Sequence, residues 1–183
     1  MSLEAWSTAA AVASFAVITI TAIAALIQLA HLRRSNQIQA VIELGNEFRA
    51  VAAQIGFVYA ELPEKMKDPE FRRKIGVAIN TNDHPELLAC VFFEQMGMLV
   101  RWQLMDEHFI MDYAGGANSI VRCWTNLQDV IAIRRRSAPT VYQNFEYLAS
   151  CAKKWLARFP DGNYPPGEER IPLTDRWADG PPA

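Results

Sequence analysis

The chain has 183 residues, with 18 Lys and Arg against 20 Asp and Glu, so its formal net charge is −2. This near balance excludes the large basic field that proteins use to bind nucleic acid, and the length allows one membrane anchor plus one modest domain. Three widely spaced cysteines, Cys90, Cys123 and Cys151, form no Cys-x-x-Cys pair. We therefore expect these cysteines to be reduced and to lie in the core as small apolar residues, as is usual in a reducing compartment.

The first feature along the chain is a long uncharged segment. Residues 5–30 carry no charge, Glu4 precedes them, and His31, Arg33 and Arg34 follow. At about 1.5 Å per residue, a helix of this length crosses a hydrocarbon core of about 30 Å. A cleaved signal peptide has a basic start and an apolar core of only about 7–15 residues. The segment therefore predicts a retained transmembrane helix, with a cleaved signal peptide and a buried hairpin helix as the alternatives.

The flanks of this segment predict its orientation. Arg33, Arg34 and Arg49 follow it, whereas no Lys or Arg precedes it. The side of a span that is richer in Lys and Arg stays cytoplasmic, and Trp side chains concentrate at the interfaces. We expect a cell-membrane protein with its N-terminus outside, its domain in the cytoplasm, and Trp6 at the outer interface.

Small and hydroxyl-bearing side chains recur along this helix at intervals of seven residues. Such a repeat keeps one seam facing a neighbouring helix, and residues of this kind favour helix association in a bilayer. The pattern predicts a homo-oligomer or docking on a larger membrane-protein complex. A chance recurrence in an Ala-rich helix and a pore-lining stripe are the alternatives. The seam consists of Ser7, Ala10, Ser14, Val17, Thr21, Ala24 and Gln28.

Residues 35–159 predict a small all-α cytoplasmic bundle. The anchor continues as one helix that ends before Pro63, because apolar residues keep a spacing of three to four beyond it. No stretch alternates with a period of two for long enough to predict a strand. Further helices are predicted over about 69–80, 85–105, 106–113 and 118–136, with a last one opening at Pro139.

The helix over 85–105 is the most apolar part of this bundle. Its spacing predicts a central core helix with one buried face. We expect that face to contain Leu88, Val91, Phe92, Met96, Leu99 and Trp102.

Residues 160–183 differ in composition from the bundle. Pro and Gly are frequent, and five Asp or Glu stand against two Arg. Such a segment predicts an extended acidic tail without a core of its own. The expected organisation is a transmembrane anchor over 1–34, the bundle over 35–159 and this tail.

Few residues in the bundle suggest chemistry. Glu94 lies within an apolar helix, where a carboxylate needs a partner or a raised pKa, and we expect Arg101 or Arg122 to pair with it. His108 and Asp112 are four residues apart and share a helical face, but the Glu-x-x-His pairs of di-iron bundles do not occur. We expect no metal and no cofactor, with an enzyme site near Glu94, His108 and Asp112 as an alternative.

Two arginine clusters have phosphate-binding potential. Arg33 and Arg34 follow the anchor, and the run Arg134-Arg135-Arg136 ends a predicted helix. Contact with lipid headgroups is one interpretation. For the run, the alternative is that the cations favour the helix dipole and cap terminal carbonyls. No glycine-rich phosphate loop, Gly-x-Ser-x-Gly motif or informative Cys–His pair accompanies them.

Several core and capping residues resemble a helical family of bacteria and phages that is catalogued as a domain of unknown function. The likeness covers roughly residues 10–157, and many members carry an N-terminal membrane helix. It implies a helical fold and no activity, so no functional residue is transferred. The resemblance rests on Phe92-Phe93-Glu94-Gln95-Met96-Gly97, Leu99, Asp106-Glu107, Trp124, Pro139, Phe145 and Leu148.

These patterns together favour a non-enzymatic single-pass membrane protein. We expect an interaction, scaffold or accessory subunit whose partners are the lipid bilayer and either copies of itself or a larger complex. A stress or phage-defence sensor whose oligomer perturbs the membrane is an alternative from another class. The seam carries the first expectation, while ion leakage on overexpression would favour the second.

Overall fold

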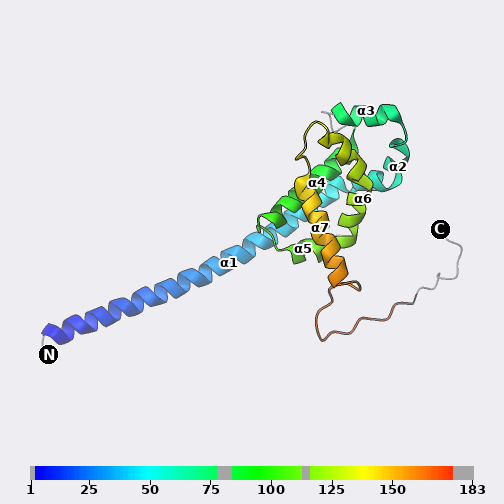
Figure 1. Cartoon of the computed structure of the whole chain (residues 1–183). Coiled ribbons are helices and arrows are strands. Elements are labelled where there is room, and N and C mark those ends of the chain that lie inside the picture. Colours follow the sequence, from blue (N-terminus) through cyan, green and yellow to red (C-terminus); the bar gives the residue numbers. More distant parts are fainter. Residues whose placement is uncertain (1–2, 78–83, 113–115, 175–183) are drawn as a thin grey trace.

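The computed structural model describes residues 3–77, 84–112 and 116–174, and no strand occurs in these ranges. The predicted all-α class is therefore confirmed. Figure 1 shows one very long helix whose second half is packed among the others. The helices are α1 (Leu3–Ala60), α2 (Leu62–Lys65), α3 (Pro69–Val77), α4 (Pro85–Arg101), α5 (Glu107–Asp112), α6 (Gly116–Arg135) and α7 (Gln143–Arg158).

Helix α1 joins two very different environments without a break. It has 58 residues, which corresponds to a length of about 87 Å at 1.5 Å per residue. The side chains of residues 12–32 are all exposed, whereas Leu44, Ile55 and Val58 are buried in the bundle. The prediction that the N-terminal helix continues past residue 35 and stops before Pro63 is confirmed, because α1 ends at Ala60.

Helix α4 is the centre of the bundle and packs against both α1 and α7. The rings of Phe48 in α1 and Phe92 in α4 are 5.9 Å apart. On the other side, Phe93 stacks on Phe145 of α7 at 4.9 Å. Phe92 and Phe93 are each 2% exposed, so two consecutive α4 residues serve two different interfaces.

The predicted single core face of α4 is wrong in part. Phe92 and Met96 are buried as expected, but Val91 and Trp102 are 42% and 67% exposed. Periodicity assumes one covered face, whereas α4 is covered by α1 on one side and by α7 on another. The buried positions consequently include Phe93, which lies outside the predicted stripe.

Three helix ends differ from the prediction because of left-handed backbone conformations. Helix α4 ends at Arg101, since Gln103 has φ of 55° and turns the chain. Helix α6 begins at Gly116, which has φ of 60°. Helix α7 begins at Gln143 rather than near Pro139, because Tyr142 has φ of 57°.

Residues 159–174, the described part of the segment after α7, form neither helix nor strand. Of these, residues 160–174 are exposed apart from local contacts, in which Arg170 donates to the Asp161 carbonyl and lies 5.3 Å from the ring centre of Tyr164. Residues 78–83, which include the end of the predicted helix over 69–80, and residues 175–183 lie outside the described residues.

Candidate functional site

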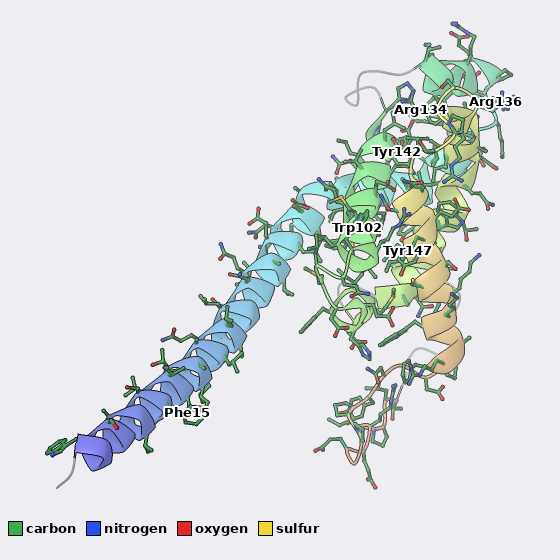
Figure 2. All side chains as sticks on the ribbon, turned by 60° about the vertical axis from the view of Figure 1, so that its left-hand side comes forward. Phe15, Trp102, Arg134, Arg136, Tyr142 and Tyr147 are labelled. Carbon is green, nitrogen blue, oxygen red and sulfur yellow. The ribbon has the colours of Figure 1, made fainter. Side chains whose placement is uncertain are left out.

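The largest exposed apolar surface lies on the first half of α1. The stretch Val12–Leu32 has 21 residues, is long and apolar enough to cross a membrane, and is 0% buried. Phe15 illustrates this exposure at 72% (Figure 2). A core helix of a soluble protein passes the same test of length and composition, but it is mostly buried. The exposed surface therefore argues against the hairpin-helix alternative, while a signal sequence near the N-terminus passes the same test.

The predicted seam lies on this surface. The Thr21 hydroxyl donates to the Val17 carbonyl at 2.8 Å, as Thr19 does to the Phe15 carbonyl at 2.9 Å. Both hydroxyls are thus paired within their own helix, which stabilises them in an apolar environment without a second chain. A seven-residue repeat drifts by about 20° per heptad on a straight helix, so the seam faces one neighbour only in a supercoiled pair. Self-association through the seam stays a prediction. Its residues Ser7, Ala10, Ser14, Val17, Thr21, Ala24 and Gln28 are all exposed.

Glu94 of α4 binds the N-terminal end of α7. Its Oε2 accepts the backbone N–H of Phe145 at 2.8 Å, and its Oε1 accepts Asn144 Nδ2 at 2.8 Å. Phe145 is the third residue of α7, where backbone N–H groups have no partner in the helix itself. Because Tyr142 at the N-cap makes no side-chain cap, Glu94 supplies this cap from another helix.

The expected arginine partners of Glu94 are engaged elsewhere. Arg101 donates to Asn144 Oδ1 at 3.0 Å and so supports the same junction indirectly. The Arg122 guanidinium lies over the Tyr59 ring at 4.3 Å. The predicted Glu94–arginine ion pair is absent among the described residues, because the carboxylate is satisfied by the end of α7.

Gly97 lies one turn after Glu94 and allows α7 to approach α4 closely. A Cβ atom at this position would meet the Asn144 carbonyl oxygen at 2.0 Å, a distance that no side chain tolerates. Glu94 and Gly97, which carry part of the family resemblance, are therefore structural residues of the α4–α7 junction.

The structure does not bring the alternative enzyme residues together. The His108 ring packs edge-on against Trp155 at 4.6 Å, whereas Glu94 holds the Phe145 end of α7. Ten residues of helix separate Phe145 from Trp155, which places these neighbours about 15 Å apart. Asp112 is exposed at the end of α5. Among the described residues no group of three His, Cys, Asp or Glu is able to hold a metal ion.

A buried acidic residue was missed by the sequence analysis. Glu86 is 0% exposed, and its Oε1 is 2.8 Å from Nδ1 of the buried His84. Its Oε2 has no hydrogen-bond partner within the described ranges. Burial, and then the nearby Glu86 carboxylate, raises the pKa of the Cys90 thiol. The available signal was the acid directly after Pro85 in the first helical turn, where the helix dipole favours negative charge.

A second polar contact, which is partly buried, joins α1 to α6. Tyr59 Oη and Cys123 Sγ are 3.0 Å apart. Burial raises the pKa of the Cys123 thiol to about 11 and also raises the pKa of Tyr59. Cys90 and Cys123 are free and buried, as the sequence analysis expected, while Cys151 is half-buried.

The three arginines at the end of α6 differ in their contacts. Arg134 donates to the Ile75 carbonyl at 3.3 Å, and Arg135 donates to the Val141 carbonyl at 3.0 Å. These two cations therefore bind backbone carbonyls of α3 and of the turn before α7, and not those at the end of their own helix. Arg136 is exposed, and Figure 2 places Arg134 and Arg136 at the end of the bundle farthest from Phe15. The side chains of Arg33 and Arg34 lie outside those described.

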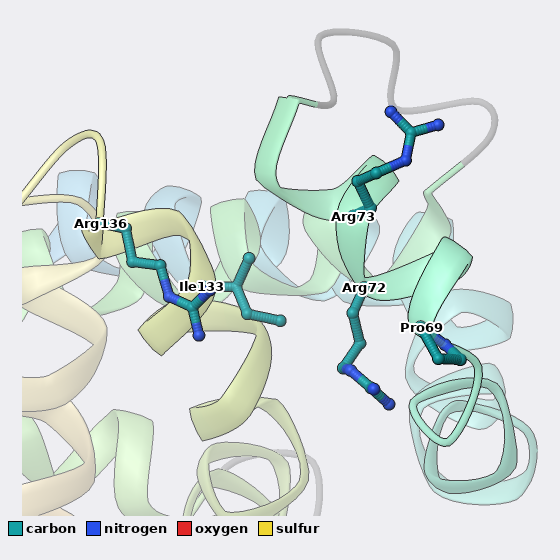
Figure 3. A pocket seen from close by; sticks show the side chains of 5 residues that line it. All are labelled: Pro69, Arg72, Arg73, Ile133 and Arg136. Carbon is teal, nitrogen blue, oxygen red and sulfur yellow. The ribbon is translucent and has the colours of Figure 1, made fainter.

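Arg136 also borders a cavity of about 300 Å³ between α3 and α6 (Figure 3). Arg73 is paired with Glu70 at 2.6 Å, so the cationic character of the cavity comes mainly from Arg72 and Arg136. The cavity adjoins α3, which follows the end of α1, about 42 Å of helix beyond Leu32. Lipid contact by this arginine run stays a prediction, and this distance does not favour it for the bilayer around α1. The lining residues are Pro69, Arg72, Arg73, Ile133 and Arg136.

Comparison with known proteins supports the resemblance noted in the sequence. No curated protein and no solved structure matches the chain. The model of a family described as a domain of unknown function, DUF4760, matches residues 15–155, which include the second part of the apolar segment and almost the whole bundle. The chain therefore belongs to the DUF4760 family.

Proposed function

We propose that the protein is a non-enzymatic single-pass membrane protein that acts as an interaction, scaffold or accessory subunit of a membrane complex. The proposal rests on the fully exposed apolar surface of Val12–Leu32. Burying one large apolar side chain contributes about 1.5–3 kcal/mol, so this surface strongly prefers lipid or apolar helices to water. The basic residues Arg33, Arg34 and Arg49 support a cytoplasmic bundle and an external N-terminus.

The continuity of α1 supports a mechanism for such a subunit. Leu44, Ile55 and Val58 are buried in the bundle and fix the second half of α1 there. The helix runs from Leu3 to Ala60 without a break, so no hinge separates the apolar half from the bundle. An arrangement of helices in the bilayer therefore sets the arrangement of the bundles outside it, together with the surfaces and tails that they present.

The seam is tested on the full chain in nanodiscs by measuring the mass of the particle and the proteins recovered with it. The test variant is Ser14→Leu with Thr21→Leu, which fills two seam positions with bulky side chains. The control is Ala16→Leu with Thr19→Leu, which adds the same side chain on the opposite side of α1. Thr19 and Thr21 make the same intrahelical hydrogen bond, so both variants remove one such bond.

We expect a wild-type oligomer that the seam variant converts to monomer and the control leaves intact. An unchanged mass and unchanged partner recovery in the seam variant would refute association through the seam. A wild-type monomer recovered with a larger complex would identify an accessory subunit instead. Ion release from vesicles by the assembled protein would favour the membrane-perturbing alternative.

A further inference from the structure

Three large apolar side chains protrude from the turn after α4 and from α5. Trp102 is 67% exposed, Leu104 is 64% exposed and Phe109 is 49% exposed. We call these three residues the apolar end patch. Exposed groups of this kind on a soluble surface usually mark a contact with a membrane or another protein.

The turn that displays the patch is ordered rather than frayed. The Leu104 and Met105 N–H groups donate to the Leu99 carbonyl at 2.9 and 3.2 Å, and Gln103 adopts φ of 55°. Met105 is 4% exposed, so the turn buries one apolar side chain while it directs Trp102 and Leu104 outward. The outward direction is therefore built into the backbone.

The patch lies at the end of the bundle that is nearer to the apolar half of α1. Helices α1 and α4 run in opposite directions, and Phe48 contacts Phe92. From this contact, Trp102 lies ten residues along α4, or about 15 Å, while Leu32 lies sixteen residues back along α1, or about 24 Å. Trp102 is thus only about 9 Å beyond the level of Leu32 along α1. Figure 2 shows the same order, with Trp102 between Phe15 and Arg134.

The distance of about 9 Å between the levels of Leu32 and Trp102 is close to the thickness of the headgroup layer of a bilayer. A bilayer of about 40–45 Å with a hydrocarbon core of about 30 Å has roughly 5–8 Å of headgroup region on each side. A Trp side chain that begins near the outer limit of this layer reaches into it, and Trp is enriched there because its ring is apolar and its N–H is polar.

The charges near the patch indicate what kind of lipid contact it makes. Arg101 is exposed beside Trp102, but Asp106, Glu107 and Asp112 are exposed in the same segment. Because most of these neighbouring charges are acidic, they do not attract anionic headgroups. Apolar burial is therefore the driving force, and the contact needs neither anionic lipid nor low salt.

We propose that Trp102, Leu104 and Phe109 insert into the interfacial layer of the same bilayer that holds α1. The bundle then rests on the membrane and is held at two places, instead of standing away from it on α1 alone. This inference rests on the proposed membrane anchor. It also directs the arginine-lined cavity between α3 and α6 away from the membrane.

The test measures Trp fluorescence of the full chain in nanodiscs of zwitterionic lipid, with and without bromine on the upper acyl chains. Bromine quenches only Trp side chains that enter this layer. Trp6→Phe and Trp177→Phe form the background, because Trp6 lies near the span and Trp177 lies outside the described residues. We expect quenching in this background at both low and high salt.

Two further substitutions assign the quenching to one residue. Trp102→Phe is expected to abolish it, whereas Trp124→Phe, which removes a half-buried Trp of α6, is expected to preserve it. Unquenched Trp102 fluorescence would overturn the inference. A blue-shifted but unquenched Trp102 would do the same and would indicate that a second copy covers the patch.

A separate reporter distinguishes failure of the patch from failure of the anchor. Phe15→Trp, placed in the background that also lacks Trp102, introduces a probe near the N-terminal end of the exposed stretch Val12–Leu32, at the depth of the upper acyl chains. Quenching of this probe without quenching of Trp102 would refute only the contact of the patch. Absence of quenching at both positions would refute the proposed membrane anchor as well.

Discussion

Two apolar helical segments of this protein have opposite surroundings. The stretch Val12–Leu32 is 0% buried. Helix α4, over Pro85–Arg101, lies between α1 and α7 and buries Phe92 and Phe93 almost completely. A helix that is apolar on most sides needs a cover on most sides. Helix α4 finds that cover within the chain, whereas the described residues offer none to the apolar half of α1.

The two segments also differ in how specifically they define a neighbour. Helix α4 carries Glu94, which caps α7, and Gly97, which admits the Asn144 carbonyl. The apolar half of α1 satisfies the hydroxyls of Thr19 and Thr21 internally. The comparison teaches that apolar composition demands burial, while a few polar and small residues determine which partner provides it.

Replacing a Phe by Ala in each of the two segments is expected to give the largest difference in the free energy of unfolding. We expect Phe93→Ala to lower the free energy of unfolding of the bundle by about 3–5 kcal/mol, because it leaves a cavity between α4 and α7. Phe15→Ala is expected to change it by less than about 0.5 kcal/mol, since that ring contacts no core. Denaturant unfolding in nanodiscs, followed by near-UV circular dichroism, measures both. Equal losses would show that the apolar half of α1 packs on the bundle.

High pH is expected to lower the stability of the bundle but not of the apolar half of α1, because only the bundle contains buried thiols. The pKa of Cys123 is about 11 in the folded state against an ordinary value of 9.0, since burial disfavours the thiolate. The unfolded chain therefore loses this proton first. The stabilisation is complete below about pH 9 and is lost as the pH rises through 11, by about 2–3 kcal/mol.

Unfolding measurements at pH 8 and pH 11 test this dependence. Cys123→Ala is expected to reduce the loss of stability, and residual far-UV helicity from α1 is expected to persist in the membrane at both values. An identical loss of stability in wild type and Cys123→Ala would contradict the assignment to this thiol.

Local features of the fold were predictable from sequence because they depend on neighbouring residues. Pro69 and Pro85 mark the observed starts of α3 and α4, and the spacing of apolar residues identified α1 as continuous. The start of α7 was not predictable, because Tyr142 adopts a left-handed conformation that is rare for this residue type. Pro139 consequently opens a turn and not the helix.

The α4–α7 junction was not predictable because its partners are distant in the sequence. Glu94 is separated from Phe145 by 51 residues, and no periodicity links them. The sequence identified Glu94 as a carboxylate in need of a partner, which is correct, but charge pairing suggested arginine. The buried Glu86 escaped notice for a similar reason, since an acid in a first helical turn is usually exposed to solvent.

Gly97 in α4 and Gly56 in α1 differ in the space that is available to an added side chain. Gly97→Ala is expected to destabilise the bundle by about 1–3 kcal/mol, because its Cβ would meet the Asn144 carbonyl oxygen. Gly56→Ala in α1 meets nothing within 4 Å and is expected to stabilise by about 0.5–1 kcal/mol through helix propensity. Opposite signs in denaturant unfolding are the expected result. Destabilisation by both would show that α1 is also closely approached at Gly56.

A moderate loss of stability is expected when the cap from α4 to α7 is removed. Glu94→Ala is expected to cost about 1–2 kcal/mol, because the Phe145 N–H loses its acceptor at the start of a helix. Glu94→Gln is expected to cost about half as much, since it keeps one acceptor oxygen but loses the favourable interaction of its charge with the helix dipole.

Gln95→Ala is the matched control for this cap, because Gln95 is exposed and adjacent on the same helix. Amide hydrogen exchange at Phe145 gives a local readout beside the global unfolding. We expect faster exchange there in Glu94→Ala and an unchanged rate in Gln95→Ala. If Glu94→Ala lost stability without faster exchange at Phe145, the carboxylate would act through some contact other than this cap. A stability order of Glu94→Ala below Glu94→Gln below wild type would instead show that α4 selects α7 by a directed hydrogen bond. The hydroxyls of Thr19 and Thr21 in the apolar half of α1 are used within their own helix.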